Sequence, residues 1–240
     1  MKNNLFTAIG LMSGTSMDGV DASLIKSDGI NEFTNILDEY YKFNDDLYKK
    51  LVNLRNLIFL KEDLLKYSKD LDELSRELTI FHSEIIKDIS YKYKKNVDIV
   101  GFHGQTIFHN PKQGVTKQIG DGKLLSKLTR KKVVYDFRQL DIKNGGQGAP
   151  LTPIFHNLIS KKISIKYKIK YPICFLNIGG ISNITVTLED KENSYDKFKA
   201  FDIGPGNCLI DQWIIKNSND KYDRNGYIGE SGKIDKLILN

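Results

Sequence analysis

The sequence GLMSGTSMDGVDASL, Gly10 to Leu24, carries more structural information than any other part of this chain. An apolar segment runs into a turn rich in glycine and hydroxyl groups, and a second apolar segment follows, which predicts a β-hairpin. Gly14 and Gly19 can adopt a positive φ and admit a ligand close to the backbone, and the hydroxyl groups between them suit an oxyanion. Asp18 and Asp21 suit a magnesium shell or a catalytic water. The same residue types occur in turns without further function, so the rest of the sequence has to distinguish phosphate binding from a plain turn.

The composition is that of a folded protein with one large or two smaller domains, because 40% of the 240 residues are hydrophobic and 10% are aromatic. The formal net charge is +6, from 36 basic and 30 acidic residues. Lysine alternates with Ile and Tyr at 161–172, a pattern also seen in strands that bind nucleic acid. Acidic residues are interspersed, however, and no RNA-binding signature occurs. We therefore interpret the lysines as a solvated surface and expect no nucleic-acid partner.

Neither a membrane segment nor a cysteine framework is visible in the sequence. No window approaches the ~18–20 uninterrupted apolar residues of a membrane span. The first residues, MKNNLFTAIG, lead straight into a predicted strand without the parts of a signal peptide. Cys174 and Cys208 lack the spacing of a zinc or redox pair, so we expect both to be buried as small hydrophobic residues in a reducing compartment. These observations predict a cytoplasmic protein without a membrane partner.

Apolar segments typical of strands alternate with segments of helical periodicity, which predicts an α/β fold. Between Asp45 and Lys95, leucine and isoleucine recur at roughly helical spacing, so two or three amphipathic helices should cover a sheet. Further helices are predicted at 122–131, 153–162 and 207–216. The predicted strands are 6–12, 20–26, 97–102, 132–137, 173–178, 184–188 and 199–203.

The turn pattern of the first hairpin occurs a second time, in FLNIGGISNITVTL at Phe175 to Leu188. One such hairpin in each half of a chain is typical of two-lobed folds that hold nucleotide phosphates from both sides. No GxxxxGK[ST] sequence is present and no GxGxxG opens a helix after a strand, so the P-loop and Rossmann types of site have no support. Downstream, GPGNCLIDQWI places Asn207 at the start of a predicted helix, where free amides favour anions.

Seven segments of the chain combine glycine-rich turns with polar and charged residues. They are GLMSGTSMDGVD (10–21), GFHGQTIFHNP (101–111), QIGDG (118–122), VVYDFRQLDIKNGGQGAPLTPIFH (133–156), FLNIGGISNIT (175–185), FDIGPGNCLIDQW (201–213) and YDRNGYIGESG (222–232). Together and in this order they resemble the anhydro-N-acetylmuramic acid kinase family. The resemblance extends over the whole chain apart from the helical region after the first hairpin.

This resemblance implies the fold shared by actin, sugar kinases and heat-shock chaperone ATPases, in which two ribonuclease-H-like lobes flank a cleft. Residues 1–165 would form the first lobe, with the phosphate hairpin and the sugar site. Residues 166–240 would begin the nucleotide-binding lobe, which we expect to be incomplete because family members continue beyond the equivalent of Asn240. The resemblance also implies ATP with Mg²⁺ as cofactor, a homodimer, and a reaction in peptidoglycan recycling that opens 1,6-anhydro-N-acetylmuramic acid hydrolytically to its 6-phosphate.

The expected sugar site centres on Asp136, at the end of an apolar strand, where open α/β sheets present ligand-binding groups. The family motif makes Asp136 the catalytic base, and Asp141 is its nearest competitor. If the strand continues, Arg138 lies on the same side as Asp136 and suits the lactyl carboxylate of the sugar. His103 has no identifiable carboxylate partner and is expected to position the sugar at most. The other expected sugar contacts are Gln105, Thr106 and Gln147.

The expected ATP-binding residues come from both hairpins and from the glycine-rich segment after the second. They are Gly14, Thr15, Ser16, Met17, Asp18, Gly19, Val20, Asp21, Gly179, Gly180, Asn183, Gly204, Gly206 and Asn207. The remaining histidines lack ligand spacing, so we expect no metal ion besides the Mg²⁺ that accompanies ATP. Two alternatives stay open: a truncated, non-catalytic protein that binds muramyl sugars, and another sugar kinase of the same fold.

Overall fold

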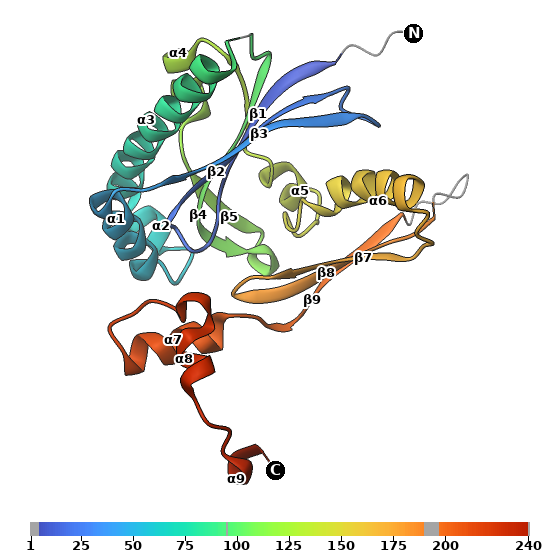
Figure 1. Cartoon of the computed structure of the whole chain (residues 1–240). Coiled ribbons are helices and arrows are strands. Elements are labelled where there is room, and N and C mark those ends of the chain that lie inside the picture. The colour runs from blue at the N-terminus through green and yellow to red at the C-terminus, as the bar shows by residue number, and fades with distance from the viewer. Residues whose placement is uncertain (1–4, 95, 190–196, 240) are drawn as a thin grey trace. The chain divides into compact units, whose positions relative to one another are not determined.

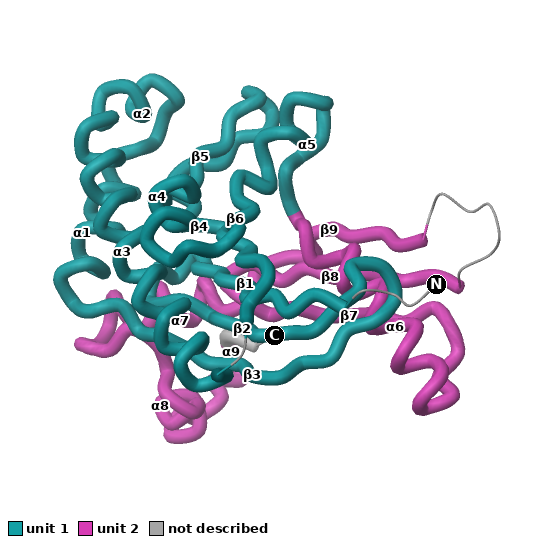
Figure 2. Tube along the Cα trace, turned by 90° about the horizontal axis from the view of Figure 1, so that it is seen from above, with its two compact units in different colours: residues 1–149 teal, residues 150–240 magenta. Residues whose placement is uncertain are grey.

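A computed structural model describes residues 5–94, 96–189 and 197–239 of the chain. The chain divides into two units, Met1–Ala149 and Pro150–Asn240, which Figure 2 shows in different colours. The predicted boundary between residues 165 and 166 falls inside helix α6 (Pro153–Tyr167) of the second unit. The assignment of the two units to lobes of a kinase stays a prediction.

The first unit is built on a six-stranded sheet (Figure 1). The strand order is β3-β2-β1-β4-β5, and β6 also pairs with β4. Neighbours among β1, β2 and β3 are antiparallel, whereas β4 runs parallel to β1 and β6 and antiparallel to β5. The long β4 pairs with β6 through its first residues and with β5 through its last. The strands are β1 (Phe6–Ser13), β2 (Gly19–Ser27), β3 (Phe33–Lys42), β4 (Ile99–Asn110), β5 (Val115–Ile119) and β6 (Lys132–Tyr135).

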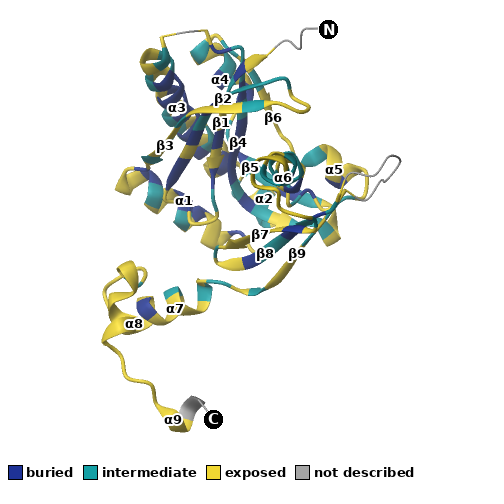
Figure 3. Ribbon diagram, turned by 45° about the vertical axis from the view of Figure 1, so that its right-hand side comes forward, coloured by how far each residue is buried: buried dark blue, intermediate teal, exposed yellow. Residues whose placement is uncertain are grey.

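Helices cover this sheet and supply much of the core of the first unit. Asn44 caps α1 by accepting a hydrogen bond from the Leu47 amide at 2.8 Å. Leucines at helical spacing along α1 and α3 are buried, and each stabilises the fold by roughly 1.5–3 kcal/mol. The buried residues run along the inner faces of α1 and α3 and along β1 and β4 (Figure 3). The helices are α1 (Asp45–Leu57), α2 (Asp63–Lys66), α3 (Ser68–Tyr93), the 3₁₀ helix η1 (Pro111–Gln113), α4 (Gly122–Thr129) and α5 (Gln139–Lys143).

The second unit contains a three-stranded antiparallel sheet in the order β7-β8-β9, and α6 contacts β8 and β9. Apolar side chains on this sheet remain exposed: Leu176 is 56% exposed and Ile178 is 59% exposed. Within the described part of this unit, the hydrophobic side chains that are buried are Ile173 and Ile214. The elements after α6 are β7 (Ile173–Ile178), β8 (Ile181–Thr187), β9 (Phe198–Pro205), α7 (Cys208–Asn217), the 3₁₀ helix η2 (Arg224–Gly226), α8 (Tyr227–Ser231) and α9 (Lys236–Leu239).

The α/β class and all seven predicted strands are confirmed, but the sequence prediction missed β3 and β5. Both lie at an edge of the sheet path, where one side of the strand faces solvent and polar residues interrupt the apolar pattern. The expected burial of Cys174 is wrong, because Cys174 is exposed on β7, and Cys208 is only half-buried. None of the helices in the described ranges has the length and apolar content to cross a membrane.

Candidate functional site

A cavity of about 320 Å³ lies beside Asp136 in the first unit, and we call it the Asp136 cavity. Its walls come from β4, β5, the end of β6 and the short helix α5. Tyr135, the last residue of β6, pairs with Phe102 of the parallel strand β4, so Asp136 follows the carboxyl end of its strand, as the sequence predicted. The lining residues are Phe102, His103, Gly104, Lys117, Gln118, Ile119, Gly120, Tyr135, Asp136, Gln139 and Lys143.

Asp136 has an uncommon backbone conformation, with φ at 61° in the left-handed region. The predicted strand 132–137 ends at Tyr135, so strand alternation does not place Arg138 beside Asp136, and this part of the prediction is wrong. Although Asp136 is an exposed residue overall, partial desolvation of its carboxyl raises its pKa, and the charges of Lys143 and Lys117 act in the opposite direction. A carboxylate with a raised pKa accepts a proton more readily, which suits general base catalysis.

His103, which is buried and lines the cavity, pairs with the half-buried Arg138. The Nε and Nη2 atoms of Arg138 donate to Nε2 of His103 at 3.0 and 2.9 Å, and Nδ1 of His103 donates to the Gly104 carbonyl at 2.8 Å. This pattern assigns the imidazole proton to Nδ1 and requires a neutral ring. Burial lowers the pKa of His103, and the Arg138 charge lowers it further. His103 therefore serves as a neutral acceptor that fixes the guanidinium.

The glycine-rich loop Gly145–Pro150, which we call the GGQGAP loop, is held on both sides of Gly148. The Gly148 amide donates to Oδ2 of Asp141 at 2.6 Å, and Nη1 of Arg138 donates to the Gly148 carbonyl at 3.0 Å. A Cβ at Gly146 would collide with the Asp141 carboxylate, so this close approach requires glycine. Asp141 thus holds the loop, whereas Asp136 is the carboxylate that lines the cavity.

The turn between β1 and β2 is tied to β4 by Gln105, whose side chain is fully buried. Nε2 of Gln105 donates to the Gly14 carbonyl at 2.9 Å, and its Oε1 accepts from the Ser13 hydroxyl at 2.5 Å. The Met17 amide closes the turn onto the same Gly14 carbonyl at 3.2 Å. Gln105 therefore fixes the conformation of the β1–β2 turn through hydrogen bonds to Ser13 and Gly14.

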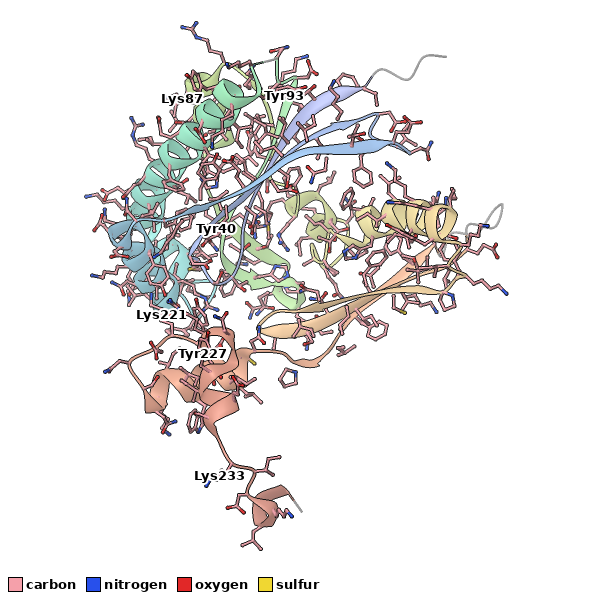
Figure 4. All side chains as sticks on the ribbon, viewed as in Figure 1. Tyr40, Lys87, Tyr93, Lys221, Tyr227 and Lys233 are labelled. Carbon is pink, nitrogen blue, oxygen red and sulfur yellow. The ribbon has the colours of Figure 1, made fainter. Side chains whose placement is uncertain are left out.

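Asp18 is held in place by one neighbour in the β1–β2 turn and one on β3. The Ser16 hydroxyl donates to its Oδ1 at 2.5 Å, and the Tyr40 hydroxyl from β3 forms a second hydrogen bond with the carboxylate. Burial, followed by the Asp18 charge, raises the pKa of Tyr40, which is labelled in Figure 4, to about 12. A Cβ at Gly19 would lie 2.5 Å from the Tyr41 carbonyl and 2.6 Å from the Tyr40 hydroxyl, so only glycine fits there.

In the second unit, two glycine-rich loops join through their backbones. The Gly206 amide donates to the Gly180 carbonyl at 2.9 Å, the Asn207 amide donates to the Gly179 carbonyl at 2.7 Å, and the Cys208 amide donates to the Gly180 carbonyl at 3.3 Å. A Cβ at Gly206 would collide with the Gly179 carbonyl. The amides of Asn207 and Cys208 at the start of α7 are therefore hydrogen-bonded to the neighbouring loop and are not free for an anion, contrary to the sequence prediction for Asn207.

The chain matches the family model described as anhydro-N-acetylmuramic acid kinase over residues 6–240. It belongs to this family. The chain is 52% identical over 235 residues to the anhydro-N-acetylmuramic acid kinase of Pelagibacter ubique (strain HTCC1062), an alignment that covers 98% of this chain and 61% of that protein. It is 42% identical over 235 residues to the enzyme of the same name from Rhizobium etli, covering 95% of this chain and 60% of the relative. The chain thus spans about 60% of the length of these curated relatives.

Within this family member, the structure brings several of the predicted residues together. His103 and Arg138 meet at the Asp136 cavity, and the glycines of the second unit meet in the paired loops. The predicted ATP-binding residues Gly14–Asp21 occupy the β1–β2 turn and the start of β2, but Met17 and Val20 are buried in the core.

Other predicted residues lie apart from the cavity. Gln105 lies beneath the β1–β2 turn, and Thr106 accepts a hydrogen bond from the Gln118 side chain at 3.2 Å. Gln147 is exposed on the GGQGAP loop, Asn183 is on β8, and Gly204 has a φ of 149° on β9. The direct ligand contacts expected of these residues stay predictions.

The residues of the site that sequence reasoning missed include Tyr40, Lys117, Gln139 and Lys143. Tyr40 and Lys117 lie on the two strands that the sequence prediction did not identify, and the other two lie on the unpredicted helix α5. The spacing of Gln139 and Lys143, four residues apart, was the available signal, since it places both on one face of a helix.

Proposed function

We propose that this chain carries the sugar site of an ATP-dependent kinase that opens 1,6-anhydro-N-acetylmuramic acid and phosphorylates it to N-acetylmuramic acid 6-phosphate. The observation that carries the proposal is the Asp136 carboxyl, which has a raised pKa and lies at the wall of a cavity next to the His103–Arg138 pair. Membership of the family supports the same reaction.

In the proposed reaction Asp136 takes a proton from a water molecule as the water oxygen bonds to the anomeric carbon. The bond between the anomeric carbon and the C6 oxygen breaks, and its electron pair stays on the C6 oxygen. That oxygen bonds to the γ-phosphorus of ATP while the bond from this phosphorus to ADP breaks. Water attack at an anomeric carbon follows the logic of inverting glycosidases, with phosphoryl transfer in place of a protonating acid.

The β1–β2 turn is the proposed phosphate site of the first unit, and the paired loops at Gly179–Gly180 and Gly204–Asn207 are the proposed phosphate site of the second. Mg²⁺ bound with a nucleotide typically needs only one or two protein carboxylates. Asp18, oriented by Ser16 and Tyr40, and the exposed Asp21 fit that requirement. When bound, Mg²⁺ would neutralise charge on the phosphates.

The proposal also includes the fold of the lobes, the oligomeric state and the cellular role of the enzyme. The strand order of the first unit, with three antiparallel strands followed by parallel ones, supports a ribonuclease-H-like lobe of the actin and sugar-kinase type. We propose a second, nucleotide-binding lobe that starts in the second unit, a homodimer, a cytoplasmic location and a role in peptidoglycan recycling.

The test is to incubate the purified chain with Mg²⁺, ATP and 1,6-anhydro-N-acetylmuramic acid, to follow the sugar 6-phosphate by mass, and to measure sugar binding by calorimetry. Formation of the 6-phosphate is the expected result. Sugar binding without product would favour the non-catalytic binder. Phosphorylation of other sugars, with no reaction of 1,6-anhydro-N-acetylmuramic acid, would favour another sugar kinase. The absence of both sugar binding and product would overturn the proposal.

A further inference from the structure

Two lysines that the proposed mechanism does not use, Lys117 on β5 and Lys143 on α5, line the Asp136 cavity. Neither forms an ion pair within 4.0 Å in the part of the chain that the structure describes. Both charges nevertheless reach the Asp136 carboxyl, since both influence its ionisation. The lysines thus face the cavity while their positive charges remain available to a ligand.

The fold holds both lysines toward the same space. Nε2 of Gln139 donates to the Thr116 carbonyl at 2.7 Å, which ties α5 to β5. Lys117 follows Thr116 on the strand, and Lys143 lies four residues, or about one helical turn, after Gln139 on α5. This hydrogen bond therefore joins the two lysine-bearing elements at the cavity wall.

The charges that line the cavity favour an anionic ligand. Lys117 and Lys143 are cations, Asp136 is the one carboxylate among the lining residues, and His103 is a neutral acceptor. Arg138, which the sequence suggested as the carboxylate-binding residue, already directs three donors at His103 and the Gly148 carbonyl. The lining therefore keeps a formal excess of one positive charge, and the lysines are the cations with uncommitted donors.

We infer that Lys117 and Lys143 are specificity residues that bind the carboxylate of an acidic substituent on the sugar and so select acidic over neutral anhydro sugars. The inference rests on the proposed function, because it concerns the same site. In N-acetylmuramic acid the carboxylate belongs to the lactyl group, whereas the base Asp136 acts at the sugar ring. Two flexible ammonium groups suit such a carboxylate on a short arm, since each lysine presents three rotatable donors.

The experiment compares two ligands by calorimetry on the full 240-residue chain: 1,6-anhydro-N-acetylmuramic acid and the neutral 1,6-anhydro-N-acetylglucosamine, which lacks the lactyl group. We expect the wild-type chain to prefer the acidic sugar by roughly tenfold. Lys117→Gln and Lys143→Gln should each lower the affinity for the acidic sugar by about three- to fivefold and leave the affinity for the neutral sugar unchanged. Lys49→Gln, a change of an exposed lysine on α1, is the matched control and should alter neither affinity.

Each other result overturns the inference in a recognisable way. Equal wild-type affinity for the two sugars would refute the specificity role while leaving the proposed function intact. Equal losses for both sugars in the lysine variants would assign the lysines to the fold of the site, and circular dichroism of the variants would identify a general loss of structure. Failure of the wild-type chain to bind either sugar would refute the proposed function, and the inference with it.

Discussion

Arg138 directs two of its donors, Nε and Nη2, at one acceptor, the Nε2 atom of His103, at 3.0 and 2.9 Å. A third donor reaches the Gly148 carbonyl. Because a guanidinium has five donors, three are occupied inside the protein before any ligand arrives. The pair joins β4 to the GGQGAP loop.

Asp136→Asn should lower turnover by roughly 10²–10⁴-fold, because an amide cannot take the proton of the attacking water. Sugar affinity should change little, since binding and water activation are separate contributions. Steady-state kinetics on a full-length relative that carries this site, together with calorimetry on this chain, would check both parts. Asp70→Asn, at an exposed position of α3, is the control. Near-normal turnover of Asp136→Asn would remove Asp136 from the role of base.

Gln105→Ala should destabilise the first unit by about 1–3 kcal/mol, because it leaves the buried Ser13 hydroxyl without this partner and removes the donor to the Gly14 carbonyl. Urea denaturation measures the free energy of unfolding of each variant. The side chain of Gln113 is exposed, and Gln113→Ala should change the stability by less than about 0.5 kcal/mol. Equal effects of the two changes would contradict the role of Gln105 beneath the turn.

Gly146→Ala should displace the Asp141 carboxylate and release the Gly148 amide, since the added Cβ collides with that carboxylate. We expect roughly a tenfold loss of sugar affinity in calorimetry, with the fold retained. Gly10→Ala adds a Cβ that meets nothing within 4 Å and should leave the affinity unchanged. Unchanged affinity for Gly146→Ala would mean that the GGQGAP loop does not contribute to the sugar site.

In the second unit, Gly206→Ala should separate the paired loops, because its Cβ would collide with the Gly179 carbonyl. Nucleotide affinity, measured by titration with a fluorescent ATP analogue, should fall by about tenfold or more. Gly180→Ala is the comparison variant, because its added Cβ would lie 3.9 Å from Cβ of Cys208, which is an ordinary van der Waals contact. If both variants bind nucleotide like the wild type, these loops do not form the phosphate site.

Protonation of His82 should make the stability of the first unit fall in acid. The imidazole is fully buried on α3, its Nδ1 contacts the Leu78 carbonyl at 2.8 Å, and burial lowers its pKa from 6.5 to about 4. The unfolded chain therefore binds a proton below pH 6.5 that the folded chain binds only near pH 4. The stability associated with neutral His82 is present in full above pH 6.5. As the pH falls toward 4, the free energy of unfolding decreases by about 3 kcal/mol.

Urea unfolding at pH 7, 6, 5 and 4.5 would measure this dependence, with His82→Gln as the variant that lacks the titrating group. The slope of stability against pH should be shallower in His82→Gln than in the wild type. His109→Gln serves as the comparison, because His109 is exposed and should change the slope less. Identical slopes for the wild type and His82→Gln would refute this assignment.

The local elements could be predicted from the sequence because their signals lie within short windows. Alternating apolar residues around the SGTS turn predicted β1 and β2, and leucines at helical spacing predicted α1 and α3. The strand β5 could not be predicted in the same way, because VTKQI is short, polar and stabilised by its partner β4. The family could also be identified from the ordered motifs, since these are features of the sequence itself.

The composition of the site depended on tertiary structure. Arg138 meets His103 across 35 positions of the chain, and Gln105 meets Gly14 across 91 positions, separations at which sequence periodicity carries no information. The same packing buries Gln105 beneath the hairpin and engages Arg138 in hydrogen bonds to His103 and the Gly148 carbonyl. It also brought Lys117 and Lys143 to the Asp136 cavity. The sequence by itself determined most of the elements, the family and the candidate base, because local propensity and residue order specify them. Only packing between distant segments decided which side chains face a ligand, because a buried polar group must find its partner inside the fold.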